Sequence, residues 1–201
     1  MSVGVKRPLD EMRALADEVA ALLDAACDRL AIAGSIRRRV PEVSDVELVV
    51  VPRLIAYRDG LWGDRETVED QLALRVTALV AAGTLGWRRL GDRAAANGPR
   101  YRSLIYRDVP LDLFSPDDDS FPVVLLIRTG PASFSRRVVT PRSKGGLLPD
   151  FMRVKDGRLW SSGQPVACRS EHDVFALLGL AYIPPERRTG VERAPVAGEP
   201  A

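Results

Sequence analysis

The sequence predicts an α+β fold, with a mixed central sheet in its N-terminal part and a smaller α/β part after it. Apolar residues recur at helical spacing in residues 8–28 and 65–82. Elsewhere the period changes to two or the run is continuously β-branched, as in residues 45–51, 100–106 and 109–114. Of the 201 residues, 46% are hydrophobic and 28% charged, which is typical of a folded globular protein.

The N-terminal elements follow from local signals. Pro8 suits the first turn of a helix that we expect to run to about Asp28. A short strand is predicted at 30–33, and residues 45–51 predict the strongest strand of the chain because they are apolar and β-branched. A second amphipathic helix is expected over residues 65–82.

Capping and turn residues predict the C-terminal elements. Ser120 is expected to cap a short apolar helix, and Pro131 to start another. A hairpin is predicted to turn at Asp156 and Gly157. Ser170 should begin the last helix.

Composition excludes several classes of protein. No apolar run approaches the roughly 18 residues that cross a bilayer, so we expect a soluble protein without a membrane partner. Cys27 and Cys168 provide no disulfide framework, which favours a reducing cytoplasm. With His172 as the single histidine and two distant cysteines, the composition does not favour a zinc site, and we expect any metal to be Mg²⁺ or Mn²⁺ held by carboxylates.

Charge is uneven along the chain. The net charge is +2, but residues 120–201 hold 12 basic and 7 acidic side chains. Most of the basic residues are arginines, which bind phosphate through two parallel hydrogen bonds. This bias suits a phosphate ligand, although charge alone does not identify one.

Three acidic residues lie within predicted core strands. Asp45 and Glu47 are two apart and project from the same face, and Asp112 interrupts another apolar strand. Buried carboxylates need compensation, which two divalent cations about 4 Å apart would supply while aligning a phosphoryl transfer. The alternative is that these acids lie at strand ends in solvent or pair with arginines.

Gly34 and Ser35 follow a predicted buried strand and precede three arginines. Backbone N–H groups, a hydroxyl and cationic side chains at such a turn form a site for phosphates. Ten residues separate Ser35 from Asp45, enough for one helical turn and a return to the adjacent strand. A phosphate site and metal carboxylates would then face one cleft.

The run from Gly34 to Arg39, followed by Ser44 to Glu47, resembles the GS-x-R-R…D-x-D/E signature of the nucleotidyltransferases, and within them of the family X DNA polymerases typified by DNA polymerase beta. Thr129-Gly130 resembles the T-G turn of that family. The resemblance extends from about Lys6 to Arg188 and implies a minimal form with palm and C-terminal subdomains only. It implies a palm over residues 1–118, a C-terminal nascent-base-pair-binding (thumb or fingers-like) subdomain over 119–189, and a disordered tail over 190–201.

The resemblance also implies roles for individual residues. Two Mg²⁺ ions, or Mn²⁺, would be bound by the catalytic residues Asp45, Glu47 and Asp112, and Asp112 would accept the proton of a primer 3′-hydroxyl. Nucleotide contacts are implied for Gly34, Ser35, Arg38, Lys6, Ile127, Arg128, Thr129, Gly130 and Ser135. DNA phosphate contacts are implied for Arg136, Arg137, Arg142 and Lys144.

The implied activity is addition of dNMP from a dNTP to a primer 3′-hydroxyl on primer-template or gapped DNA, in gap filling or repair, by a monomer. Ile127 and Arg128 stand where many relatives have an aromatic pair, and Ser135 where a base-contacting asparagine is common. These departures keep open a template-independent or non-DNA nucleotidyltransferase. A non-catalytic nucleic-acid-binding module is a further alternative.

Overall fold

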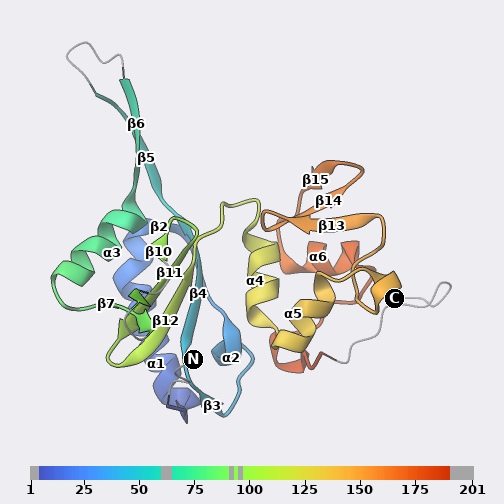
Figure 1. Cartoon of the computed structure of the whole chain (residues 1–201), viewed down its shortest axis with the longest axis horizontal. Helices are drawn as coiled ribbons and strands as arrows, with labels where there is room; N and C mark the ends of the chain where they lie inside the picture. Colours follow the sequence, from blue (N-terminus) through green and yellow to red (C-terminus); the bar gives the residue numbers. More distant parts are fainter. Residues whose placement is uncertain (1–4, 60–64, 91–92, 95–96, 191–201) are drawn as a thin grey trace.

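A mixed sheet organises the N-terminal part of the chain (Figure 1). The computed structural model describes residues 5–59, 65–90, 93–94 and 97–190. The sheet has the order β10-β11-β12-β4-β2, with β7 also paired to β11. Its strands are β2 (Cys27–Ile32), β4 (Val46–Pro52), β7 (Gly86–Trp87), β10 (Asn97–Gly98), β11 (Tyr101–Tyr106) and β12 (Val109–Phe114). β12 and β4 run parallel, whereas β11 and β2 pair antiparallel with them, which confirms the predicted mixed sheet.

The two faces of the sheet bury different clusters because side chains alternate along each strand. On one face, Val46, Leu48 and Val50 pack with residues of α1 and α3. On the other face, Val49 and Phe114 pack with residues of α4. The helices are α1 (Leu9–Leu23), α2 (Gly34–Arg37), α3 (Gln71–Ala81), α4 (Phe121–Thr129), α5 (Ala132–Val138) and α6 (Glu171–Leu177).

The C-terminal part has its own hydrophobic cluster around Phe134 and Phe175, both fully buried. α4, α5 and α6 surround this cluster together with a three-stranded sheet (Figure 1). The strands of that sheet are β13 (Met152–Lys155), β14 (Arg158–Ser161) and β15 (Gln164–Val166). α4 contributes to the clusters on both of its sides, so it joins the two parts of the chain.

Short elements complete the fold. Two of them, β5 and β6, form a hairpin that projects away from the central sheet (Figure 1). The short strands are β1 (Arg7–Pro8), β3 (Glu42–Val43), β5 (Leu54–Asp59), β6 (Arg65–Asp70), β8 (Arg89–Leu90) and β9 (Arg93–Ala94). The 3₁₀ turns are η1 (Asp24–Ala26), η2 (Arg142–Lys144) and η3 (Pro185–Arg187).

Three local predictions were wrong. The first helix ends at Leu23 rather than Asp28, because residues 27–32 pair with β4 instead. Residues 65–70 are the strand β6, and α3 starts only after Asp70, whose side chain caps it by accepting from the Ala73 N–H at 3.0 Å. Ser120 stands at the predicted N-cap position of α4, but its side chain makes no capping hydrogen bond because its hydroxyl donates to Asp117.

Other predictions are confirmed. The strand at 45–51 is β4, and the hairpin of β13 and β14 turns at Asp156 and Gly157, both with positive φ. Ser170 caps α6. In the described part of the chain, no helix combines the length and apolar character needed to cross a membrane. Residues 191–201 of the predicted tail lie outside the described residues.

Candidate active site

The sheet brings the three acidic residues together at one end of its α4-covered face. Asp112 of β12 is the direct partner of Glu47 on the parallel strand β4. Asp45 precedes β4 and lies on the same face as Glu47, because the two are separated by one residue in extended chain. Further along this face, the next paired positions are Phe114 and Val49, which pack under α4. The same alternation that buries the core therefore aligns the acids.

The electrostatic environment opposes ionisation of two of these acids. The pKa of Glu47 is raised to about 7, first by burial and then by the negative charges of Asp45 and Asp112, while the positive charges of Arg128 and Arg38 act in the opposite direction. The pKa of Asp45 is raised by burial and then by Asp112. Ionised together, these carboxylates repel one another in a poorly solvated place, so an added cation would be stabilised here.

Gly34 places the backbone of the turn after β2 directly against Glu47. Its φ is +61°, in the left-handed region that favours glycine, and a Cβ at this position would overlap the Oε2 atom of Glu47. The Ala33 N–H donates to the Glu47 carbonyl oxygen at 2.8 Å, which anchors the turn to β4. Gly34 is also the first residue of the short helix α2, and Ser35 is the second. The glycine is therefore required both by conformation and by the carboxylate beside it.

A cavity of about 420 Å³ opens in front of this turn. It brings two of the acids together with most of the residues predicted to contact a nucleotide. Its lining consists of Ser35, Arg38, Asp45, Glu47, Ile127, Arg128, Gly130, Pro131, Ala132 and Ser135. We call this space the polar cavity. Asp112 is not among the described residues that line it.

Three residues predicted to contact the nucleotide have other partners. Lys6 is exposed and lies 3.7 Å from Glu42, and it is not among the described residues lining the polar cavity. Thr129 is fully buried, and its hydroxyl accepts from Arg37 at 2.6 Å. The Ser135 hydroxyl donates to a backbone carbonyl of α4. These three side chains are therefore less available to contact a nucleotide than the motif implies.

Arg38 lines the polar cavity while holding the neighbouring turn. Its Nη1 donates to the Thr129 carbonyl oxygen at 2.6 Å. Burial lowers the pKa of the Arg38 guanidinium, and the charges of Glu47 and Asp45 oppose that change. The guanidinium therefore links the end of α2 to the C-terminal end of α4.

The four residues predicted to contact DNA differ in exposure. Arg136 and Lys144 are exposed. Arg137 donates to the Gly190 carbonyl oxygen at 3.2 Å, and Arg142 to the Leu178 carbonyl oxygen at 2.6 Å. Arg137 and Arg142 therefore also hold the C-terminal part together.

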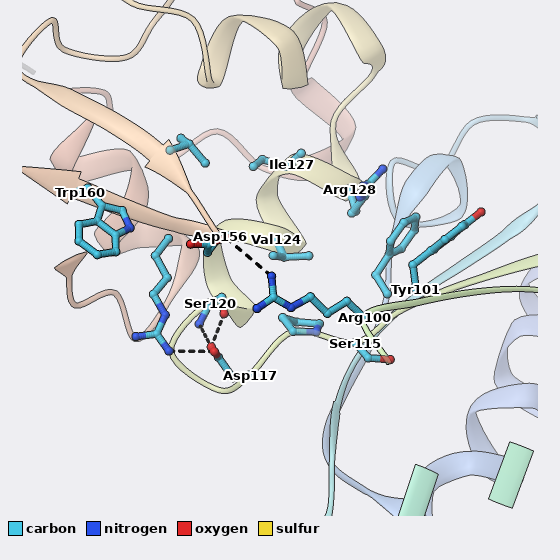
Figure 2. Close-up of a pocket in the computed structure, with 15 residues that line it drawn as sticks. Arg100, Tyr101, Ser115, Asp117, Ser120, Val124, Ile127, Arg128, Asp156 and Trp160 are labelled. Atoms are coloured by element: carbon cyan, nitrogen blue, oxygen red, sulfur yellow. Dashed lines mark hydrogen bonds and ion pairs between the residues drawn. The ribbon is translucent and has the colours of Figure 1, made fainter. Parts of the chain in front are cut away.

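A second cavity, of about 560 Å³, lies between β11–β12 and the C-terminal part (Figure 2). We call it the junction cavity. Tyr101 and Arg128 lie on one side of it and Trp160 on the other. Arg128 stacks over Phe114 at 3.9 Å. Ile127 and Arg128 line both cavities, so the two spaces meet at the end of α4.

Two groups of site residues were missed from the sequence. Tyr101 and Ser103 both donate hydrogen bonds to Asp112. Glu171 of α6 binds Arg37 of α2 and Arg188 near the C-terminal end. The alternation of β11 places Tyr101 and Ser103 on one face, but only the strand register identifies the carboxylate opposite them. Arg37 and Glu171 are 134 residues apart, which no local signal connects.

The three acids supply only carboxylate oxygens as possible metal ligands. Within the described ranges, no three His, Cys, Asp or Glu side chains gather closely enough to form a ready-made metal site. The donor set nevertheless fits a hard divalent cation, because carboxylate oxygens are the ligands that Mg²⁺ and Mn²⁺ prefer. Burial and the mutual repulsion of the carboxylates raise the pKa values of Asp45 and Glu47, and a bound cation would favour the ionised forms of both.

The chain is similar to DNA polymerase beta in its fold and in one C-terminal segment. Residues 124–189 match the family model of the DNA polymerase beta thumb. The whole fold is similar to that of Leishmania infantum polymerase beta in a ternary P/T complex, with a TM-score of 0.65 and 20% sequence identity over 93% of this chain and 78% of that one. No curated protein matches the sequence. The chain therefore has a family X DNA polymerase-like fold, completed by a segment that matches the polymerase beta thumb.

Proposed function

We propose that the chain is a DNA polymerase-like nucleotidyltransferase that transfers dNMP from a dNTP to a primer 3′-hydroxyl and releases pyrophosphate. Gap filling during DNA repair is the proposed setting. The observation that carries the proposal is the direct pairing of Asp112 with Glu47 on parallel strands, beside the positive-φ turn at Gly34. The likeness to polymerase beta supports the same reaction class by analogy.

Each part of the polar cavity has a role in this proposal. Ser35 and Arg38 would hold the triphosphate, with the backbone at Gly34 approaching it closely. Two Mg²⁺ ions held by Asp45, Glu47 and Asp112 would supply positive charge at the phosphate oxygens. Asp112 would accept the proton of the attacking hydroxyl. Such chemistry depends mainly on positioning and charge neutralisation, so few residues suffice.

The junction cavity is the proposed site for the end of the acceptor strand. It meets the polar cavity at Ile127 and Arg128, on the side where the Tyr101 hydroxyl reaches Asp112. Tyr101 and Trp160 supply aromatic surface for a base. The exposed Arg136 and Lys144 would add contacts to DNA phosphates and make binding sensitive to salt.

We also propose a division into a palm over residues 1–118 and a C-terminal, nascent-base-pair-binding subdomain over 119–189, acting as a monomer. The separate hydrophobic cluster around Phe134 and Phe175 supports this division. Cys27 and Cys168 are buried free thiols, and burial raises the pKa of each to about 11. Unreactive thiols of this kind suit the reducing cytoplasm that we propose as the location.

A template-independent or non-DNA nucleotidyltransferase is the second candidate. The observation that favours it is that Ser135 donates its hydroxyl to the Ile127 carbonyl oxygen, and Ala132 beside it is apolar. The polar cavity therefore offers few side-chain groups that would read a base. Under this alternative, incorporation would not follow the templating base.

Primer extension by the purified chain tests the proposal. We expect Mg²⁺-dependent addition of the templated dNTP at a one-nucleotide gap, and weaker addition on a single-stranded primer or with rNTPs. Asp112→Asn or Asp45→Asn should abolish extension without changing the melting temperature greatly. Asp108→Asn is the matched control, because Asp108 is an exposed acid in the turn between β11 and β12.

The outcomes separate the candidates. Extension that is equal with and without a template would support the second candidate. Binding of the gapped DNA by the parent chain without extension, with either Mg²⁺ or Mn²⁺, would support the non-catalytic nucleic-acid-binding module. Retained extension in Asp112→Asn would reject the proposed active site.

A further inference from the structure

Asp112 is held by two hydroxyl groups from the neighbouring strand. Its Oδ1 atom accepts hydrogen bonds from the Tyr101 hydroxyl at 2.8 Å and from the Ser103 hydroxyl at 3.0 Å. Ser103 is the direct antiparallel partner of Asp112, and Tyr101 lies two residues earlier on the same face of β11. Both donors therefore reach one carboxylate oxygen from one side.

This arrangement constrains the carboxylate. Two donors on Oδ1 oppose rotation of the group about its Cβ–Cγ bond, and hydrogen bonds to an ionised acceptor are stronger than those between neutral groups. Neither donor is a cation, so these two hydrogen bonds orient the Asp112 carboxylate without adding a positive charge. Both hydrogen bonds fall on Oδ1 rather than on Oδ2.

The Tyr101 ring is itself fixed in place. It stacks on Phe114 with 5.1 Å between ring centroids, and Arg128 covers Phe114. Tyr101 and Arg128 lie together in the wall of the junction cavity (Figure 2). Ser103 is buried, at 3% exposure. The two hydroxyls thus belong to side chains that have little freedom to move with the carboxylate.

A second tyrosine on β11 provides a control, because it makes a similar hydrogen bond away from the proposed site. Tyr106 is also a residue of β11, and its hydroxyl donates to the Glu18 carboxylate at 2.7 Å. Tyr106 and Glu18 belong to the opposite, α1-covered side of the sheet. The chain therefore offers two tyrosine–carboxylate pairs of similar geometry, of which one touches a proposed catalytic residue.

We propose that Tyr101 and Ser103 are positioning residues for Asp112, which hold Oδ1 against the sheet and present Oδ2 to the cation and the acceptor hydroxyl. This inference rests on the proposed function. The inference adds two residues to the site that the sequence motif does not contain. It also explains why Tyr101 and Ser103, two residues with hydroxyl groups, lie on the same face of β11.

The test compares Tyr101→Phe, Ser103→Ala and the double variant with Tyr106→Phe. Each is assayed for kcat and for the dNTP KM in gap filling, and for Mn²⁺ binding by electron paramagnetic resonance of the free ion in the absence of substrates. We expect Tyr101→Phe to lower kcat about tenfold, the size expected for loss of one hydrogen bond to a charged group, with KM unchanged. The Mn²⁺ dissociation constant should rise severalfold, and the double variant should lose more of both. Tyr106→Phe should change neither quantity.

Failure of this inference differs from failure of the proposed function. Tyr101→Phe and Ser103→Ala with the parent kcat and Mn²⁺ affinity would overturn the inference, provided that Asp112→Asn is inactive. A rise in KM alone would also overturn it, because Tyr101 would then act only as cavity wall. If Ser103→Ala does not fold, Tyr101→Phe decides, since it keeps the stacked ring. A parent chain without transferase activity, whose Mn²⁺ binding is unchanged by Asp112→Asn, would reject the proposed function instead.

Discussion

At the scale of single residues, Glu47 combines burial with nearby negative charge. Its folded pKa of about 7 lies above the ordinary value of 4.5, first because of burial and then because of Asp45 and Asp112. A carboxyl group with a raised folded pKa binds protons more tightly in the folded state. Its ionisation therefore destabilises the fold as pH rises from about 4.5 through about 7.

Glu47→Gln should stabilise the metal-free protein above pH 7 by about 1–3 kcal/mol, and by much less near pH 4.5. The amide keeps the size of the side chain but carries no charge. Urea unfolding in EDTA at pH 5 and pH 8 measures the difference. Added Mg²⁺ should reduce the gain, because the ion stabilises only the carboxylate. A gain of equal size at both pH values would contradict the electrostatic explanation.

Gly34→Ala should be damaging for two reasons. A positive φ costs about 1–2 kcal/mol for a residue with a Cβ, and the new Cβ would overlap the Glu47 carboxylate. We expect more than a tenfold loss of transferase activity, on the order of a displaced catalytic group. The control is Gly83→Ala, since Gly83 also has a positive φ of +72° but nothing lies within 4 Å of its Cβ position. Activity lost equally in both variants would show that the contact with Glu47 is unimportant.

At the scale of elements, hydrogen bonds in the first turn of α6 stabilise that helix. The Ser170 hydroxyl accepts from the Asp173 N–H at 3.3 Å, and the Asp173 carboxylate accepts from the Ser170 N–H at 3.0 Å. This capping box satisfies backbone N–H groups that a short helix leaves unpaired. It also places Glu171, the first residue of α6, against Arg37 of α2.

Ser170→Ala should lower the free energy of unfolding by about 1 kcal/mol, as loss of a helix cap usually does. Urea titration followed by circular dichroism measures it. Ser170→Asp is the matched control, because aspartate is also a good capping residue and should retain most of the stability. Equal stability of all three proteins would indicate that the capping box contributes little.

At the scale of the whole molecule, Glu171 joins the two parts of the chain. Its carboxylate is buried and binds the Arg37 guanidinium through two hydrogen bonds, of 2.9 and 2.6 Å, and the Arg188 guanidinium at 3.0 Å. Burial alone would raise the pKa of Glu171, but the hydrogen bonds from Arg37 and Arg188 outweigh it and hold the pKa below the usual 4.5. The buried guanidinium of Arg188 depends on this partner.

Because the folded pKa of Glu171 is lowered, its contribution to stability is complete above about pH 4.5 and is lost as pH falls below that value. Glu171→Gln should cost about 3 kcal/mol at pH 7, the usual loss when one partner of a buried ion pair is removed. It should also flatten the acid limb of a stability–pH curve measured by urea unfolding. Glu11→Gln, which removes an exposed pair with Arg7, should change stability by less than about 1 kcal/mol. If the stability–pH curve of Glu171→Gln were the same as that of the parent chain, the buried carboxylate of Glu171 would not stabilise the fold.

Local signals predicted those elements whose partners are near in sequence. The hairpin at Asp156 and Gly157 and the cap at Ser170 depend on residues within a few positions, so their residue types were sufficient. The end of α1 was wrong because β4 draws residues 27–32 into the sheet, and residues 65–70 became a strand because β5 pairs with them. Competition between helix propensity and strand pairing is decided by contacts that the local sequence does not contain.

By itself, the sequence determined which side chains share a strand face: the period of two in extended chain requires Asp45 and Glu47 to project together. Only the tertiary structure decided what stands opposite them. Strand register paired Asp112 with Glu47 and set Tyr101 and Ser103 on its Oδ1 atom, and packing joined Arg37 to Glu171 across 134 residues. The physical reason is that alternation is a property of one strand, whereas register and ion pairing depend on how separate segments bury their apolar faces together.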